Sequence, residues 1–77
     1  MEYYKTMIDE KRLKQVGAKL RAERMSRGLT QEQVAKKAGI TANHYALVER
    51  GVKDPTSTTM SNIIKAIGTS HHVIFDK

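Results

Sequence analysis

The sequence predicts an all-α fold, a compact bundle of four to five helices with a short helix-turn-helix pair at its centre. Three observations support this prediction: apolar residues recur at three- and four-residue steps, a glycine ends each such stretch, and only three residues separate the two central stretches. A chain of 77 residues forms one small domain. We expect that domain to span residues 13–70, between an N-terminal extension over residues 1–12 and an apolar C-terminal tail over residues 71–77.

The first helix is predicted from about Glu10 to Arg27, where Gly28 ends a pattern of apolar residues at helical spacing. Its apolar positions are Leu13, Val16 and Leu20. The last helix is predicted from about Thr58 to Ile67, after a polar loop that contains the chain's one proline, Pro55. Its inward positions are Met60, Ile63, Ile64 and Ile67, and Gly68 is its stop signal.

The central pair consists of helices predicted over residues 31–38 and 42–50. Thr30 is a good N-cap for the first of them, and Gln33 completes a weak capping box. The predicted inward residues are Val34, Ala35, Ala38, Tyr45 and Val48. Two short helices joined by three residues must cross steeply, as they do in a helix-turn-helix, and Gly39 tolerates the left-handed backbone of such a turn. An ordinary corner between two helices of a bundle is the less favoured alternative.

Composition narrows the class of protein. The net charge is +6, from 14 Lys and Arg against 8 Asp and Glu, which suggests a polyanionic partner such as nucleic acid or an anionic membrane surface. The same charge could simply keep a small domain in solution. No cysteine is present, so disulfide and Cys-based zinc sites are excluded. Neither a membrane span nor a signal peptide is evident, and we expect a cytoplasmic protein.

Over residues 13–70 the sequence resembles the phage-repressor and Cro-like (XRE) family of helix-turn-helix proteins. The matching residues are Val16, Gly17, Leu20, Arg21, Arg24, Gly28, Leu29, Thr30, Gln31, Val34, Ala35, Ala38, Gly39, Ile40, Thr41, Tyr45, Val48, Glu49 and Gly51, followed by Pro55 and the stretch 63–68. The resemblance implies a bundle of the lambda-repressor-like type that binds duplex DNA, usually as a dimer. It also implies an ion pair between Arg24 and Glu49.

Four residues of helix 42–50 are candidates for contact with DNA bases: Ala42, Asn43, His44 and Leu47. At about 100° per residue, Asn43 and Leu47 lie opposite the apolar face of this helix, and Ala42 and His44 flank them. Asn43 can pair with adenine through two hydrogen bonds, and Leu47 can contact a thymine methyl. His44 can donate to a guanine or to a phosphate. The alternative for each is a solvated helix position.

Candidates for contact with DNA phosphates are Gln31, Thr41, Arg50 and Lys53. Gln31 begins the second helix, where free backbone N–H groups and the helix dipole favour an anion. We expect helix 42–50 to be the recognition helix that enters the major groove, and Arg50 and Lys53 follow it toward the DNA backbone. Such contacts position a protein on DNA without carrying sequence information.

Three features depart from the family or lie outside its motif. Leu47 stands where the family more often has a polar residue, and Ser57 stands where an apolar residue is usual, which suggests a frayed or shifted start of the last helix. Apolar residues at the two ends could pack together within one chain or across a dimer. They are Tyr3, Tyr4, Met7, Ile8, Val73, Ile74 and Phe75.

The sequence therefore predicts a sequence-specific DNA-binding transcriptional regulator, a repressor that acts as a homodimer on double-stranded operator DNA. We expect no enzymatic activity and no cofactor. We also expect no metal at His71 and His72, because adjacent histidines point in different directions. One alternative is an antitoxin-type or other protein-interaction module that uses its DNA-binding domain for autoregulation. A basic domain that binds membrane or RNA non-specifically is a further one.

Overall fold

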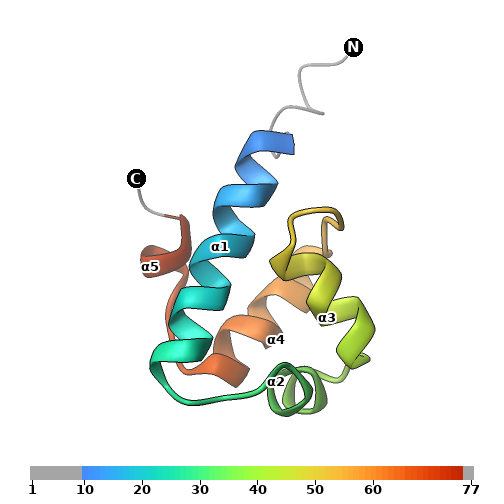
Figure 1. Cartoon of the computed structure of the whole chain (residues 1–77), viewed down its shortest axis with the longest axis vertical. Coiled ribbons are helices and arrows are strands. Elements are labelled where there is room, and N and C mark those ends of the chain that lie inside the picture. The colour runs from blue at the N-terminus through green and yellow to red at the C-terminus, as the bar shows by residue number, and fades with distance from the viewer. Residues whose placement is uncertain (1–9, 76–77) are drawn as a thin grey trace.

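The computed structural model describes residues 10–75, and within this range it contains helices and no strand (Figure 1). The five helices are α1 (Glu10–Ser26), α2 (Gln31–Ala38), α3 (Ala42–Glu49), α4 (Ser57–Ile67) and α5 (His71–Phe75). The all-α prediction is confirmed, and the bundle has the larger of the two predicted helix numbers. Among the described helices, none is long and apolar enough to cross a membrane.

The long helix α1 lies against α3, α4 and α5, while α2 packs on α3 and α4 at the lower end of the bundle in Figure 1. One apolar core joins the five helices. Its buried residues are Val16, Leu20, Val34, Ala35, Ala38, Tyr45, Val48, Met60, Ile63, Ile64, Ala66, Ile67 and Ile74. The inward positions predicted from helical periodicity for the central pair and the last helix are thus all buried, as are Val16 and Leu20 of the first helix. Leu13 is half-buried.

The ends of α2 follow from local sequence. The Thr30 hydroxyl accepts from the Gln33 N–H at 3.1 Å, and the Gln33 side-chain oxygen accepts from the Thr30 N–H at 2.8 Å. This is the capping box that the sequence predicts. At the other end Gly39 has φ of 77°, the left-handed conformation that lets the chain turn sharply toward α3.

Three helix boundaries differ by one residue from the prediction, and one of them is the end of α1 at Ser26 rather than Arg27. Helix α4 begins at Ser57 rather than Thr58, because the Thr56 hydroxyl accepts from the Thr59 N–H at 3.1 Å and so caps the helix one residue earlier. Ser57 is therefore part of a regular, capped first turn. Helix α3 ends at Glu49, and Arg50 is its C-cap.

The C-terminal stretch forms helix α5, which begins where the Ser70 hydroxyl accepts from the Val73 N–H at 3.3 Å. Ile74 is buried in the core, and the Arg12 guanidinium donates to the Phe75 carbonyl at 3.2 Å. These contacts hold α5 on α1 within one chain. Tyr3, Tyr4, Met7 and Ile8, which were expected to pack near this end, lie outside the described residues.

Candidate nucleic-acid interface

Helix α3 follows α2 after a turn of only three residues. The Ile40 N–H donates to the Ala35 carbonyl at 3.0 Å, and the Ile40 side chain packs against the core. Thr41 then caps α3, since its hydroxyl accepts from the His44 N–H at 3.0 Å. Thr41 is an exposed residue, and a hydroxyl that accepts one hydrogen bond can still donate its own hydrogen. The turn therefore fixes where α3 starts and in which direction it runs.

Helix α3 has two different sides. Tyr45 and Val48 are buried in the core, with exposed fractions of 0% and 2%. On the opposite side Asn43 is exposed, and Arg50 is exposed just beyond the last turn. Leu47 lies on that outer side and is half-buried. The partition that helical periodicity predicts for this helix is present in the structure.

The two flanking candidates lie closer to the protein. Ala42 is half-buried and packs against the hydrophobic core. His44 is also half-buried, and its Nε2 is buried without a hydrogen-bond partner among the described residues. In this conformation that nitrogen does not face solvent. Ala42 and His44 thus offer less free surface to a ligand than Asn43 does.

Helix α3 is fixed to α1 by the ion pair that the resemblance implies. Arg24 Nε donates to Glu49 Oε2 at 2.6 Å, and Arg24 Nη2 donates to Glu49 Oε1 at 3.2 Å. The two side chains are 12% and 3% exposed, so the pair is nearly withdrawn from water. A third bond, from Arg24 Nη1 to the Leu29 carbonyl at 2.8 Å, ties the same guanidinium to the turn before α2.

Burial and hydrogen bonding act in opposite directions on Glu49. Burial by itself would raise the pKa of this carboxyl, but Arg24, Tyr45 and Gln31 face it and together hold the pKa below its usual value of 4.5. Burial, followed by the neighbouring Glu49 carboxylate, raises the pKa of the Tyr45 phenol. Glu49 is therefore a carboxylate and Tyr45 a neutral phenol at neutral pH.

Gln31, a candidate for phosphate contact, has a partner inside the protein. Its side-chain Nε2 donates to Glu49 Oε1 at 3.0 Å, so the first residue of α2 is joined to the last residue of α3. Gln31 is half-buried, whereas Lys53 in the loop after α3 is exposed. The structure thus brings Gln31, Arg24 and Glu49 together and leaves Arg50 and Lys53 on the surface beyond α3.

Comparison with known proteins agrees with this arrangement. The sequence profile described as helix-turn-helix matches residues 20–74, well over half of the chain. The chain belongs to the Cro/C1-type (XRE) helix-turn-helix family. In this family the pair α2 and α3 forms the helix-turn-helix, and the family is one of DNA-binding regulators of transcription rather than a class of enzymes.

Several helix-turn-helix relatives are similar over most of the chain. An uncharacterized HTH-type transcriptional regulator of Sinorhizobium fredii, y4dJ, is 36% identical over 58 residues, which are 75% of each chain. The uncharacterized HTH-type transcriptional regulator YqaF of Bacillus subtilis is 32% identical over 74% of this chain and 75% of its own length. A third, MT0491 of Mycobacterium tuberculosis, is 29% identical, and the match covers 42% of that protein. No solved structure matches the chain significantly.

A close approach between α1 and the end of the helix-turn-helix was not anticipated from the sequence. A Cβ atom at Gly17 would lie 2.6 Å from the Val48 carbonyl oxygen, and one at Gly51 would lie 2.6 Å from the Lys14 Cα. Both glycines are buried. A glycine in the interior of a predicted helix was the available signal, because it costs about 1 kcal/mol relative to alanine unless close packing requires it.

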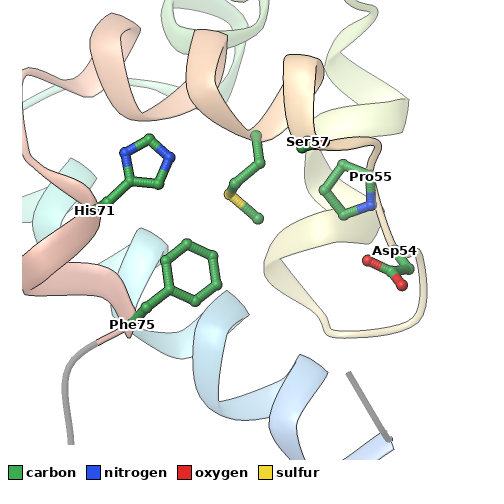
Figure 2. Close-up of a pocket in the computed structure, with 6 residues that line it drawn as sticks. Asp54, Pro55, Ser57, His71 and Phe75 are labelled. Atoms are coloured by element: carbon green, nitrogen blue, oxygen red, sulfur yellow. The ribbon is translucent and has the colours of Figure 1, made fainter. Parts of the chain in front are cut away.

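An apolar cleft of about 220 Å³ opens between α5 and the loop before α4 (Figure 2). Asp54, Ser57 and His71 line it, three residue types that hydrolases combine in catalysis. Figure 2 shows Asp54 and His71 on opposite sides of the cleft, and within residues 10–75 no hydrogen bond joins the three. His71 instead stacks on Phe75, with ring centroids 6.0 Å apart, and its Nε2 lies 3.5 Å from the Ser61 hydroxyl.

Metal-binding residues do not gather in the part of the chain that the structure describes. Among residues 10–75, no group of three or more His, Asp or Glu side chains is close enough to hold a metal ion. His71 and His72 both lie on the exposed surface of α5.

Proposed function

We propose that this chain is a sequence-specific regulator of transcription that places α3 in the major groove of double-stranded DNA. The observation that carries the proposal is the two-sided character of α3. One side of the helix is buried and locked to α1 through Glu49, and the other presents Asn43 and Arg50 to solvent. A rigidly held helix with a free polar side is what base recognition in the major groove requires.

Asn43 is the principal base-contacting residue in this proposal, because its exposed amide can pair with adenine N6 and N7. Leu47 adds apolar contact, best suited to a thymine methyl. Ala42 and His44 lie at the N-terminal end of α3 and are half-buried. They can contact bases only if the DNA approaches this end of the helix closely. The preference for adenine and thymine should therefore be strongest opposite Asn43 and Leu47.

Phosphate contacts in this proposal lie on both sides of α3. Gln31 and Thr41 begin α2 and cap α3, and Arg50 and Lys53 follow α3. Arg50 and Lys53 are charged and exposed, so each would neutralise a phosphate and release counterions. The net charge of +6 favours the same polyanionic partner.

We further propose that the chain acts in the cytoplasm as a homodimer and as a repressor. Two copies related by a two-fold axis would place their recognition helices in half-sites about 34 Å apart, one turn of the DNA helix. A dimer bound across a promoter would exclude other proteins from it. Sedimentation of the complex with a two-fold-symmetric duplex should give two chains per duplex, and one chain per duplex would contradict the dimer.

Selection of bound duplexes from a random pool tests the proposal directly. The wild-type chain should enrich a two-fold-symmetric sequence, and Asn43→Ala should weaken binding to it by about tenfold while leaving non-specific binding unchanged. Asn62→Ala, which removes an exposed amide from α4, is the matched control and should bind as wild type does. Failure to enrich any sequence would contradict the proposed function.

Salt dependence separates the phosphate contacts from the base contact. Arg50→Ala and Lys53→Ala should each lower the slope of log affinity against log salt by about 1, with equal effects on all duplex sequences. Lys65→Ala on the exposed side of α4 serves as the control and should not change the slope. An unchanged slope for both Arg50→Ala and Lys53→Ala would show that neither residue contacts a DNA phosphate.

A further inference from the structure

We infer that Glu49 is a positioning residue for phosphate binding: it orients the Gln31 amide so that one side-chain N–H remains for a DNA phosphate. The inference rests on the proposed function and deepens it, because it assigns a role in DNA binding to a buried residue that does not itself touch DNA. One buried carboxylate would then connect both helices of the helix-turn-helix, because Glu49 is itself part of α3 and is hydrogen-bonded to Gln31 of α2.

The geometry of the Glu49 carboxylate supports this role. Oε2 accepts from Arg24 at 2.6 Å, while Oε1 accepts from both Arg24 at 3.2 Å and Gln31 at 3.0 Å. Glu49 is 7% exposed, so it cannot reach a phosphate, and the Arg24 charge compensates its own. A neutralised carboxylate next to the interface does not repel the DNA backbone, yet it still accepts a hydrogen bond.

The chemistry of the side-chain amide supplies the next step. The Gln31 nitrogen carries two hydrogens in one plane, and the bond to Glu49 uses one of them. Once the first N–H is held, the direction of the second is fixed by the planarity of the amide. Gln31 is half-buried at the start of α2, and in the proposed arrangement its second N–H lies on the exposed side of the residue. A donor held in place before binding loses less conformational freedom when a ligand arrives.

Backbone groups beside this amide would complete the phosphate contact. The capping box occupies the N–H groups of Thr30 and Gln33. Among the described residues no hydrogen bond is donated by the backbone N–H of Gln31 or Glu32, as is usual for the first turn of a helix. One oriented side-chain donor beside two backbone donors at a positive helix end suits a phosphate better than either would alone.

A purely structural role for the bond between Gln31 and Glu49 makes a different prediction. In that case the bond ties α2 to α3 and changes the stability of the fold, but removal of Gln31 has no effect on DNA affinity once the protein is folded. DNA affinity of folded variants therefore distinguishes the two roles, provided that circular dichroism shows each variant to be helical at the temperature of the binding assay.

The test compares Gln31→Ala in two backgrounds, using the duplex that the selection experiment enriches. The first background is the wild type. The second carries Arg24→Met together with Glu49→Leu, since replacing a buried ion pair by apolar residues commonly preserves a fold. We expect Gln31→Ala to weaken binding about tenfold in the first background, the loss of one hydrogen bond to a charged group. In the second background the loss should be under about twofold, because Gln31 is no longer held.

Two controls make the comparison specific. Asn43→Ala should weaken binding equally in both backgrounds, because Asn43 does not contact Glu49. Gln31→Ala should leave the salt slope unchanged, because a neutral side chain releases no counterion. If the paired replacement does not fold, Glu49→Gln is used as the second background. The amide offers one acceptor oxygen in place of two, so Gln31 and Arg24 compete for it and Gln31 is held less firmly.

Equal effects of Gln31→Ala in the two backgrounds would overturn the inference, as would the absence of any effect in the wild type. So would a background that changes the Asn43→Ala effect as strongly as the Gln31→Ala effect, because Glu49 would then act through α3 as a whole. These failures are distinct from failure of the proposed function, in which the wild-type chain itself enriches no duplex.

Discussion

Two arginines near the C-terminal end of α1, three residues apart, each form an ion pair with a glutamate. The two pairs differ in their exposure to water and in the helices that they connect. Arg24 binds Glu49 of α3, and the two side chains are 12% and 3% exposed. Arg27 binds Glu23 one turn earlier in the same helix, and those side chains are 37% and 26% exposed. The first pair is shielded from water and joins two helices, whereas the second is screened by solvent and joins one helix to itself.

The exposed pair nevertheless has long-range partners. Arg27 Nη2 donates to the Gly68 carbonyl at 3.3 Å, and the Thr69 hydroxyl donates to Glu23 Oε1 at 2.9 Å. It therefore joins the end of α1 to the link between α4 and α5. A guanidinium–carboxylate pair therefore fixes α3 where water is excluded, and adds only a weak connection where water competes.

The largest effect is expected for the buried pair. Arg24→Ala should lower the free energy of unfolding by about 3 to 5 kcal/mol, because it leaves the Glu49 carboxylate buried without its counter-charge. Urea denaturation followed by circular dichroism measures this loss. Arg24→Met combined with Glu49→Leu is the control and should lose much less. A loss for Arg24→Ala no greater than that for Arg27→Ala would remove the distinction between the two pairs.

The next effect concerns the glycine beside each pair. Gly17→Ala should destabilise the protein by about 2 kcal/mol net, because its Cβ would overlap backbone oxygens of α3 while gaining helix propensity. Thermal denaturation would show the shift. At Gly68 the nearest heavy atom to an added Cβ is Arg27 Nε at 3.7 Å, so Gly68→Ala should cost only the left-handed backbone strain, about 1 kcal/mol. A larger loss at Gly68 than at Gly17 would contradict the close approach of α1 and α3.

The pH dependence of stability should also reflect the buried pair. The pKa of Glu49 in the folded protein lies below the usual 4.5, so its stabilisation is complete above that value and is lost as pH falls through the lowered pKa. Unfolding free energies measured from about pH 7 down to about pH 3 should decrease on the acid side. Replacing Arg24 and Glu49 together by Met and Leu should flatten this decrease. If the unfolding free energy of that variant decreases at acid pH as much as that of the wild type, other carboxyls cause the decrease.

The smallest effect is expected for the exposed pair. Hydrogen bonds from Thr69 and then Arg27 lower the pKa of Glu23, so its contribution has the same sign as that of Glu49, but solvent screens it. Glu23→Gln should shift the thermal midpoint by no more than replicate measurements scatter, and 1 M salt should abolish any difference. A shift comparable to that of Arg24→Ala would show that the link between α4 and α5 depends on this carboxylate.

Sequence reasoning was strongest where short-range rules decide the structure. The capping box of Thr30 and Gln33 and the inward side of α4 follow from spacing and residue type alone, and both are confirmed. Such features depend on residues three or four positions apart, so the sequence contains all the information that they need. The one-residue error at the start of α4 arose because Thr56, Ser57 and Thr58 are all acceptable caps.

The residue pattern alone specified the first four helices, their inward sides and the family, because periodicity, caps and motif spacing are local properties of the chain. Helix α5 was not predicted, since it lies in the stretch that was expected to be an apolar tail. Only the tertiary structure decided that the Gln31 amide meets Glu49, that Gly17 lies against the end of α3, and that His44 Nε2 is buried. Those contacts join residues 18 or more positions apart or depend on side-chain conformation in a packed interior. Their formation is set by how the helices pack, which no local pattern specifies.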